Sequence, residues 1–288
     1  MSVEAKIIQD SVSAGKVRLS TFQLKYPRVI HAELLTHRLF SRNSSSSRAI
    51  PVAKLIDQAI NDPAVPEYWG KNQAGMQAAE ELEGDALEYV KALWFRARNY
   101  AVDMAREMAK WGAHKQTINR LLEPFTHISV VLTATEWDNW FELRDHKDAE
   151  PHIAKLARLM RKAMAESEPA FRTTDAAWPS SWHLPYISQE ERTGRPALVL
   201  AKMSVARCAR VSYLRHDGQT PSEADDLTLF DRLVGSKPLH ASPTEHQAVP
   251  MSSCTSSFCK NFKGWQQFRY FLEKGMLPIR VFARDLKT

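Results

Sequence analysis

The 288-residue chain contains few cysteines, and their arrangement matches no familiar pattern. Cys208, Cys254 and Cys259 are odd in number and too few for a disulfide framework. Cys254 and Cys259 have no matching pair elsewhere, so their spacing fits no zinc site. We therefore expect no bound metal, and we expect a reducing compartment, the cytoplasm.

Long hydrophobic runs are also missing. No stretch approaches the roughly 20 apolar residues that a membrane-spanning helix needs. Residues 1–10 lack the basic and then apolar form of a signal peptide. No glycine-rich phosphate loop is present either, so the sequence does not support a Rossmann-type site for flavin or nicotinamide.

What the chain does contain is ordinary for a soluble globular enzyme: 44% hydrophobic and 25% charged residues. Its length suits one large domain or two modest ones. The net charge of +6 and the pI of about 9.2 are compatible with anionic ligands. This charge does not distinguish a nucleotide from a nucleic acid.

Hydrophobic periodicity indicates a mixture of helices and strands. Alternation predicts a half-buried strand over 17–24, ended by Pro27, whereas residues 128–132 fit a strand or a helix. Three- and four-residue spacing predicts helices over 29–38, 76–111 with a break at Gly84 and a stop at Gly112, 114–122, 137–144, 149–165, 222–233 and 258–274. Loops are expected over 61–75 and 235–250, and a connector over 167–194.

The most informative segment is Thr36 to Arg48, which places a histidine, three arginines, an asparagine and five serines in thirteen residues. So many hydrogen-bond donors suit a polyanion such as a nucleotide phosphate or a dinucleotide cofactor. A serine run is usually a flexible loop, but the flanking Asn43 and Arg48 favour an ordered polar loop.

The order His-Arg-x-x-Ser-x-Asn-x-x-Ser-x-Arg over residues 37–48 resembles the signature of the flavin-dependent thymidylate synthases, the ThyX family. Four further segments are similar to segments of that family: His240-Ala-Ser-Pro-Thr-Glu-His246, Ser204-Val-Ala-Arg-Cys-Ala-Arg-Val-Ser-Tyr213, Asn139-Trp-Phe-Glu-Leu-Arg144 and Asn119-Arg-Leu-Leu-Glu-Pro124. Together these matches extend over most of the chain.

The order of the segments differs from that of the family, in which the counterparts of 204–246 precede the His-Arg motif. Circular permutation is the simplest explanation, because new chain ends are tolerated where the old termini lie close together. We accordingly expect region 1–166, with the His-Arg motif and the arginine helix, a linker over 167–196, and region 197–288 completing the same ThyX-like domain. The hypothesis predicts that Ser204–His246 folds beside residues 17–48.

The resemblance implies an α+β fold of helices around a curved mixed or antiparallel sheet, and a homotetramer with sites between subunits. It also implies conversion of dUMP to dTMP, with methylenetetrahydrofolate as carbon donor, FAD as hydride carrier and NADPH as reductant. Arg144 and Ser46 are the expected catalytic residues. Nucleotide binding is expected from Ser44, Ser46, Arg48, Arg120 and Arg144. Flavin binding is expected from His37, Arg38, Asn43, Asn139, Ser204, His240, Ser242 and Glu245. Without the resemblance, Arg144 reads as a surface arginine at a helix end, and His37 and His240 read as structural histidines.

Several positions depart from the family pattern. Glu33, Thr36 and Ser44 replace a glutamine, an arginine and a glutamate, and residues 148–152 do not match the family's His-Ala-Gln-x-Glu. Losing an arginine removes a charge from a phosphate or base site. A hydroxymethylase acting on dUMP or dCMP is therefore an alternative. The segment Trp265-Gln-Gln-Phe-Arg269 contains a Gln-x-x-Arg pattern like the one that the chain lacks at 33–36, and it offers either a substitute for the missing residues or an amphipathic core helix.

Two functions of other classes remain open. One is a basic nucleic-acid-binding protein, although the arginines are scattered and no recognised nucleic-acid-binding motif is evident. The other is a catalytically dead flavoprotein kept for assembly.

Overall fold

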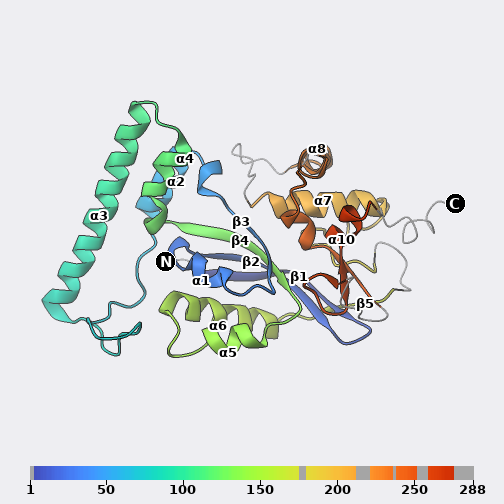
Figure 1. Cartoon of the computed structure of the whole chain (residues 1–288), viewed down its shortest axis with the longest axis horizontal. Coiled ribbons are helices and arrows are strands. Elements are labelled where there is room, and N and C mark those ends of the chain that lie inside the picture. The colour runs from blue at the N-terminus through green and yellow to red at the C-terminus, as the bar shows by residue number, and fades with distance from the viewer. Residues whose placement is uncertain (1–2, 175–179, 212–220, 236–237, 252–258, 276–288) are drawn as a thin grey trace.

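The computed structural model describes residues 3–174, 180–211, 221–235, 238–251 and 259–275, and its architecture is α+β, as predicted. Five strands form one mixed sheet in the order β3-β4-β2-β1-β5 (Figure 1). The strands are β1 (Glu4–Ser13), β2 (Arg18–Pro27), β3 (Ser41–Ser44), β4 (His127–Ala134) and β5 (Ala170–Arg172). All neighbours are antiparallel except β1 and β5, which are parallel. No helix within the described ranges has the length and apolar character of a membrane span.

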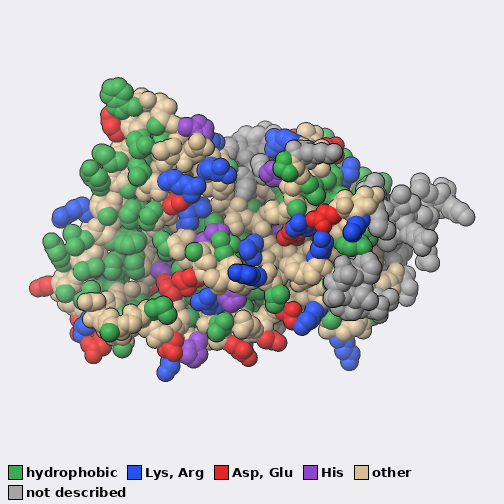
Figure 2. Space-filling model, viewed as in Figure 1, with side chains coloured by type: hydrophobic (Ala, Val, Ile, Leu, Met, Phe, Trp, Pro, Cys, Tyr) green, Lys and Arg blue, Asp and Glu red, His purple; other side chains and the backbone are tan. Residues whose placement is uncertain are grey.

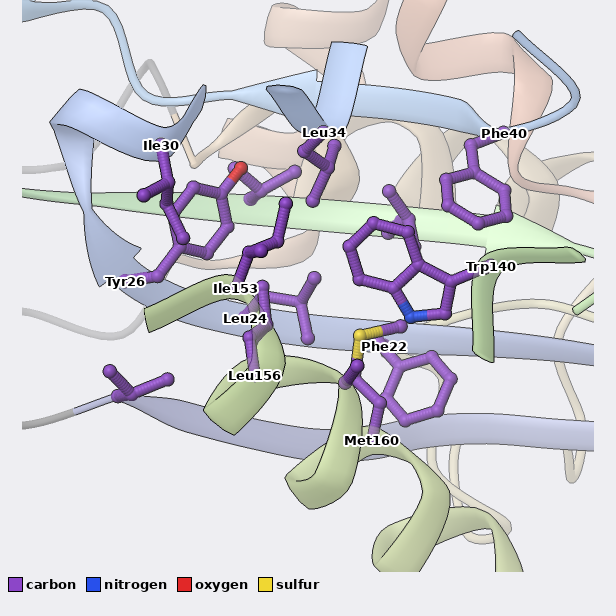
Figure 3. Close-up of a cluster of buried hydrophobic side chains, with 14 of the residues drawn as sticks. Phe22, Leu24, Tyr26, Ile30, Leu34, Phe40, Trp140, Ile153, Leu156 and Met160 are labelled. Carbon is purple, nitrogen blue, oxygen red and sulfur yellow. The ribbon is translucent and has the colours of Figure 1, made fainter. Parts of the chain in front are cut away.

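The main core lies on one face of this sheet, under two helices. Phe22, Leu24 and Tyr26 alternate along β2 and point to the same face, because successive strand residues face opposite sides. The helices α5 (Asp138–Arg144) and α6 (Pro151–Ala165) cover them with Trp140, Ile153, Leu156 and Met160 (Figure 3). Both helices were predicted from their spacing, and this packing holds α5 against the loop that precedes β3.

Between β2 and β4 the chain builds a helical layer at one end of the sheet. It contains η1 (Arg28–Ile30), α1 (His31–Leu35), η2 (Ser47–Ala49), α2 (Val52–Asn61), α3 (Gly84–Lys110), α4 (Lys115–Ile118), η3 (Asn119–Leu121) and η4 (Glu123–Phe125). Leu55 and Ala59 of α2 pack against Val102 and Ala105 of α3. The segment 128–132, left open between helix and strand, lies within β4.

The long helix α3 corrects one prediction and confirms another. Residues 76–83 are not helical, because their backbone pairs with the preceding loop: Leu82 N–H donates to the Trp69 carbonyl at 2.8 Å. At the other end Gly112 has a φ of +76°, a left-handed conformation that suits glycine and ends a helix. The predicted stop is therefore confirmed, and the predicted helical segment before Gly84, residues 76–83, is wrong.

The C-terminal part adds α7 (Ala197–Ala209), α8 (Glu223–Val234), η5 (Ser242–Glu245), a two-stranded sheet of β6 (Ala248–Pro250) and β7 (Trp265–Gln267), and α10 (Phe268–Glu273). A reciprocal capping box of Ser222 and Asp225 opens α8 where the sequence predicts a helix start. The predicted helix over 258–274 is wrong over 265–267, because these residues pair with β6 as a strand. Cys254, Phe258, Ser212 and Tyr213 lie outside the described residues.

The C-terminal part packs directly on the first strands. Leu19 of β2 is buried with Ala248, Phe262 and Trp265. Asn43 Nδ2 of β3 donates to the Cys208 carbonyl at 3.2 Å. The contact between Asn43 and Cys208 confirms the predicted apposition of 204–246 and 17–48. The segment expected as a linker supplies β5 and the fully buried Trp182.

Candidate functional site

Three neighbouring cavities follow the backbone from Thr36 to Ala49, along the loop before β3, the strand itself and η2. The Arg144 cavity is lined by Thr36, His37, Arg38, Leu39, Phe40, Glu136, Asn139, Trp140, Leu143 and Arg144. The Arg269 cavity is lined by Arg38, Phe40, Arg42, Glu245, Lys260, Asn261, Gln267 and Arg269. The serine cavity is lined by Arg42, Asn43, Ser44, Ser46, Arg48, Ala49, His240, Ser242 and Pro243. Shared side chains, Arg38 and Phe40 on one side and Arg42 on the other, join the three.

The Arg144 cavity has a volume of about 210 Å³ and brings α5 against the His-Arg loop. Arg144 is the last residue of α5, so the buried Trp140 and Phe141 one turn earlier fix its position. Its Nε donates to His37 Nε2 at 3.1 Å. His37 also meets Trp140 edge to face at 4.8 Å between ring centroids. The two residues were predicted from segments a hundred positions apart.

The electrostatics of this pair follow from burial. Desolvation, with the positive charge of Arg144, lowers the pKa of His37. The ring is therefore neutral at neutral pH, and because its Nε2 accepts a hydrogen bond, its proton lies on Nδ1. A neutral acceptor orients the guanidinium without cancelling its charge.

Two of the residues that depart from the family pattern directly contact the guanidinium of Arg144. The carboxylate of Glu33 is 3.4 Å from Arg144 Nη1, and Thr36 Oγ1 accepts from Nη2 at 3.4 Å. Burial, with the carboxylate of Glu150, raises the pKa of Glu33, while Arg144 opposes that shift. The altered residues at 33 and 36 are thus direct neighbours of Arg144.

The serine cavity, of about 450 Å³, joins β3 and η2 to η5. Most of its side-chain donors are open: Ser46, Arg48, His240 and Ser242 make no side-chain hydrogen bond to any residue that the structure describes. Asn43 is held by the Cys208 carbonyl. The predicted ordered polar loop is confirmed, because Ser45 N–H donates to the Ser129 carbonyl at 2.8 Å and Ser47 Oγ to Glu123 at 2.6 Å.

The Arg269 cavity, of about 500 Å³, contains the residues that the sequence marked least clearly. Gln267 Nε2 donates to Ser41 Oγ at 3.0 Å, and Arg269 is paired with Glu245 and Glu273. Gln267 and Arg269 therefore come from the C-terminus to the side of the His-Arg motif. Arg42, Lys260 and Asn261 were missed. Arg42 could have been noticed as a basic residue inside the motif, but Lys260 and Asn261 carry no sequence signal.

Two predicted residues lie outside all three cavities. Ser204 is fully buried on α7, where its hydroxyl donates to the Pro185 carbonyl at 2.7 Å and accepts from Gln247 at 3.1 Å. Arg120 is exposed on η3 and pairs with Glu123 at 3.0 Å. Glu123 also accepts from Ser47, so Arg120 lies beside the serine loop without lining its cavity.

A chain of buried hydrogen bonds fixes η5 to the main sheet behind these cavities. Ser11 Oγ meets His183 Nδ1 at 2.9 Å, and His183 Nε2 meets Thr21 Oγ1 at 2.7 Å. Thr21 meets Thr133 at 2.7 Å, and Thr133 meets His246 Nδ1 at 2.8 Å. Because His246 follows Glu245 directly, this chain holds the end of η5 in place.

Comparison with known protein families shows which family this chain belongs to. A model of the thymidylate synthase complementing protein family matches residues 18–170, slightly more than half of the chain. The chain belongs to this family, and the predicted resemblance to ThyX is confirmed. The match includes the His-Arg motif and Arg144 but not residues 204–246. Membership supports a nucleotide-modifying enzyme.

Two solved structures are similar in fold. One is the UMP/dUMP methylase PolB from Streptomyces cacaoi bound with 5-Br dUMP, with 17% identity and a TM-score of 0.49 over 57% of this chain and 90% of that chain. The other is the same methylase bound with 5-Br UMP, with 16% identity and a TM-score of 0.48 over 57% of this chain and 89% of that chain. A comparison with curated proteins gives no match.

Proposed function

We propose that this protein is a flavin-dependent enzyme that methylates dUMP to dTMP, with methylenetetrahydrofolate as carbon donor and NADPH as reductant. The observation that carries the proposal is the placement of Arg144 against His37 and beside Asn139, in a chain of the thymidylate synthase complementing protein family. We place the enzyme in the cytoplasm as a homotetramer with sites between subunits.

The three cavities contain a donor set that fits FAD. A dinucleotide needs donors for its pyrophosphate, and Ser242 and His240 supply open ones next to Asn43. In the proposal these residues hold the flavin together with His37, Arg38, Asn139 and Glu245. The bound flavin would supply the hydride. Ser204 would support it indirectly, because its hydroxyl is already bonded to Pro185 and Gln247.

Arg144 and the serine loop would serve the nucleotide. A uracil that accepts a carbon at C5 gains negative charge, and a guanidinium at its N3/O2 edge stabilises that charge. Arg144 is oriented for one such role by His37 and Thr36. Arg48, Ser44 and Ser46 would bind the phosphate, with Ser46 also placed at the reacting nucleotide and Arg120 nearby adding positive charge.

The mass of the product tests the proposal directly. The purified protein is incubated with dUMP, methylenetetrahydrofolate and NADPH, and the mass of the product nucleotide is measured by mass spectrometry. Formation of dTMP supports the methylase, and omission of the folate must abolish it. Unchanged dUMP, in a preparation that retains bound FAD, would refute the proposed reaction.

A hydroxymethylase acting on dUMP or dCMP is the second candidate, and a specific observation favours it. Glu33 and Thr36, which replace family residues, both contact Arg144, so they can alter which base or product the site accepts. If they do, Glu33→Gln changes the ratio of kcat/KM for dUMP and dCMP by about tenfold or more. Exclusive formation of dTMP by the wild type would rule this candidate out.

We further propose that 1–166 and 197–288 form one circularly permuted domain joined by 167–196. The packing of Asn43 on α7 and of Leu19 on β6 supports this arrangement. A relinked chain in which 197–288 precedes 1–166 tests it. That chain should fold cooperatively and bind FAD, whereas two independent unfolding transitions of the natural chain would contradict a single domain.

A further inference from the structure

The helix α3 presents an apolar surface that nothing else in the described structure covers. It is 27 residues long, yet only Val102 and Ala105 are fully buried. The side of α3 that faces α2 packs through Val102 and Ala105, together with the partly buried Trp94, Ala101 and Met108. A surface helix normally carries polar residues on the side opposite its core contacts. On α3 a second apolar stripe lies between the core side and the polar side.

This second stripe follows alternating three- and four-residue steps along the helix. Its members are Ala86, Val90, Leu93, Ala97, Tyr100, Met104, Glu107 and Trp111. The large ones are exposed: Tyr100 by 67%, Trp111 by 85% and Leu93 by 39%. Hydrophobic side chains are visible over α3 in the space-filling view (Figure 2). Glu107 is the one polar member, and its carboxylate is bonded to Trp111 and Lys110.

This alternating spacing is typical of a helix in a coiled coil. We infer that α3 pairs with α3 of a second copy of this chain, antiparallel about a two-fold axis that passes between Ala97 and Tyr100. The inference concerns assembly and does not rest on the proposed reaction. Two observations support it: the sizes of the side chains that face each other in such a pair, and the charges at the border of the stripe.

The sizes are self-complementary in this register. Tyr100 lies opposite the partner's Ala97, and Trp111 lies opposite the partner's Ala86, so each large ring meets a small residue. Leu93 lies opposite the partner's Met104, and Val90 lies opposite the partner's Glu107, which is the one polar member of the stripe. Large-against-small layers are what a well-packed helix interface requires. Burying Tyr100 and Trp111 from both copies would remove their large exposed area from water.

The charges at the border of the stripe are also self-complementary. Arg96 precedes Ala97, and Asp103 precedes Met104, so both lie on the same edge of the stripe. In the antiparallel register Arg96 faces the partner's Asp103, and the two-fold axis makes this contact twice. A parallel pair would not bring these two positions together. The charges thus specify the second copy and its direction.

Sedimentation equilibrium of the full chain tests the surface. The wild type should self-associate, and Tyr100→Glu should weaken the association by on the order of 100-fold, because a charge replaces a ring at the centre of the interface. The matched control is Asn99→Glu, which adds the same charge one residue away on the polar side. It should leave the association unchanged, and circular dichroism should show both variants folded.

A charge exchange tests the direction. Arg96→Asp and Asp103→Arg should each weaken association about tenfold, because like charges then face each other. The double variant R96D/D103R should restore it. A monomeric wild type, or an oligomer that Tyr100→Glu leaves intact while folded, would overturn the inference. Absence of rescue in the folded double variant would overturn the antiparallel register.

Discussion

The chemistry of the proposed site depends on a single guanidinium and on what surrounds it. Arg144 is four-fifths buried at the end of α5, where it meets a neutral imidazole, a hydroxyl and one carboxylate. The Glu33 carboxylate lies at 3.4 Å from Nη1, so it neutralises the charge only in part. The remaining donor capacity is available to a ligand in the adjoining cavity.

Replacing Arg144 by alanine should lower kcat/KM for the nucleotide about 10²- to 10³-fold, because the charge that stabilises the reacting ring is lost. Flavin should be retained, since most of the proposed flavin contacts come from other residues. Arg158→Ala is the matched control: this arginine is exposed on the neighbouring helix α6, and its loss should leave turnover within about twofold of the wild type. Steady-state kinetics and the flavin absorbance check both. Equal activity of the two variants would remove Arg144 from the mechanism.

The individual site residues that the sequence predicts are those that lie in a recognisable motif. His37 and Asn139 line one cavity with Arg144, and Ser46, Arg48 and His240 line another. Arg42, Lys260 and Asn261 could not be predicted as a group. They come from positions more than two hundred residues apart, and only the pairing of β7 with β6 and the packing on β3 bring them together.

Among the elements, α7 and α8 form the support for η5 and depend on one buried carboxylate. Asp226 is fully buried and accepts from Arg207 Nε at 2.8 Å and Arg210 Nε at 3.0 Å. A buried ion cluster of this kind adds little to the free energy of unfolding compared with apolar residues of the same size. Removing one charged partner is nevertheless costly, because it leaves the opposite charge buried and uncompensated.

Asp226→Asn should therefore lower the free energy of unfolding by about 2–4 kcal/mol. The control Asp231→Asn lies on the same helix, where an exposed carboxylate is 3.7 Å from Lys202, and should cost less than about 0.5 kcal/mol. Urea denaturation measures both. A cost for Asp226→Asn no larger than that of the control would show that the buried cluster does not stabilise this part of the fold.

The elements that could be predicted are those with a complete local signal. The helices α5, α6 and α8 have clear apolar spacing, and α8 also has its capping box. The strand β3 was hidden in a polar motif, because only its pairing with β4 makes those residues a strand. The strands β1 and β7 likewise depend on partners distant in sequence, and residues 76–83 have helical spacing but pair with a loop instead.

The stability of the whole molecule should depend on pH through buried histidines. Burial lowers the pKa of His246 to about 3 and of His31 to about 4, and it lowers the pKa of His183 as well. In the unfolded chain these groups protonate near pH 6.5, so below that pH the unfolded state binds more protons than the folded state. Stability is therefore full above pH 6.5 and is lost as the pH falls toward the folded-state values.

Each such histidine should contribute a slope of about 1 kcal/mol per pH unit between pH 6 and 5. The raised pKa of His152 acts in the opposite direction. His246→Gln should reduce the slope by one histidine's share, whereas His146→Gln, at a half-exposed position, should leave it unchanged. Denaturant titrations at both pH values supply the slopes. An unchanged slope in His246→Gln would mean that His246 is protonated in the folded state.

The whole chain contributes to the cavities along β3. Region 1–166 supplies Arg144 and the His-Arg motif, and region 197–288 supplies His240, Glu245 and Arg269. The resemblance predicted this convergence through the order of its motifs, and the contact of Asn43 with α7 agrees with it. The α3 surface has no counterpart in that prediction, because exposure becomes visible only once the inner side of the helix is known.

The most direct test of the central claim is the absorbance of bound flavin during a titration with dUMP. The account predicts that the purified protein carries or takes up FAD, and that dUMP perturbs the flavin bands in a saturable way, because the nucleotide lies against the cofactor in the cavities beside β3. A colourless protein that takes up no FAD and instead shifts DNA in a gel would contradict the account. So would a bound flavin whose spectrum no pyrimidine nucleotide changes.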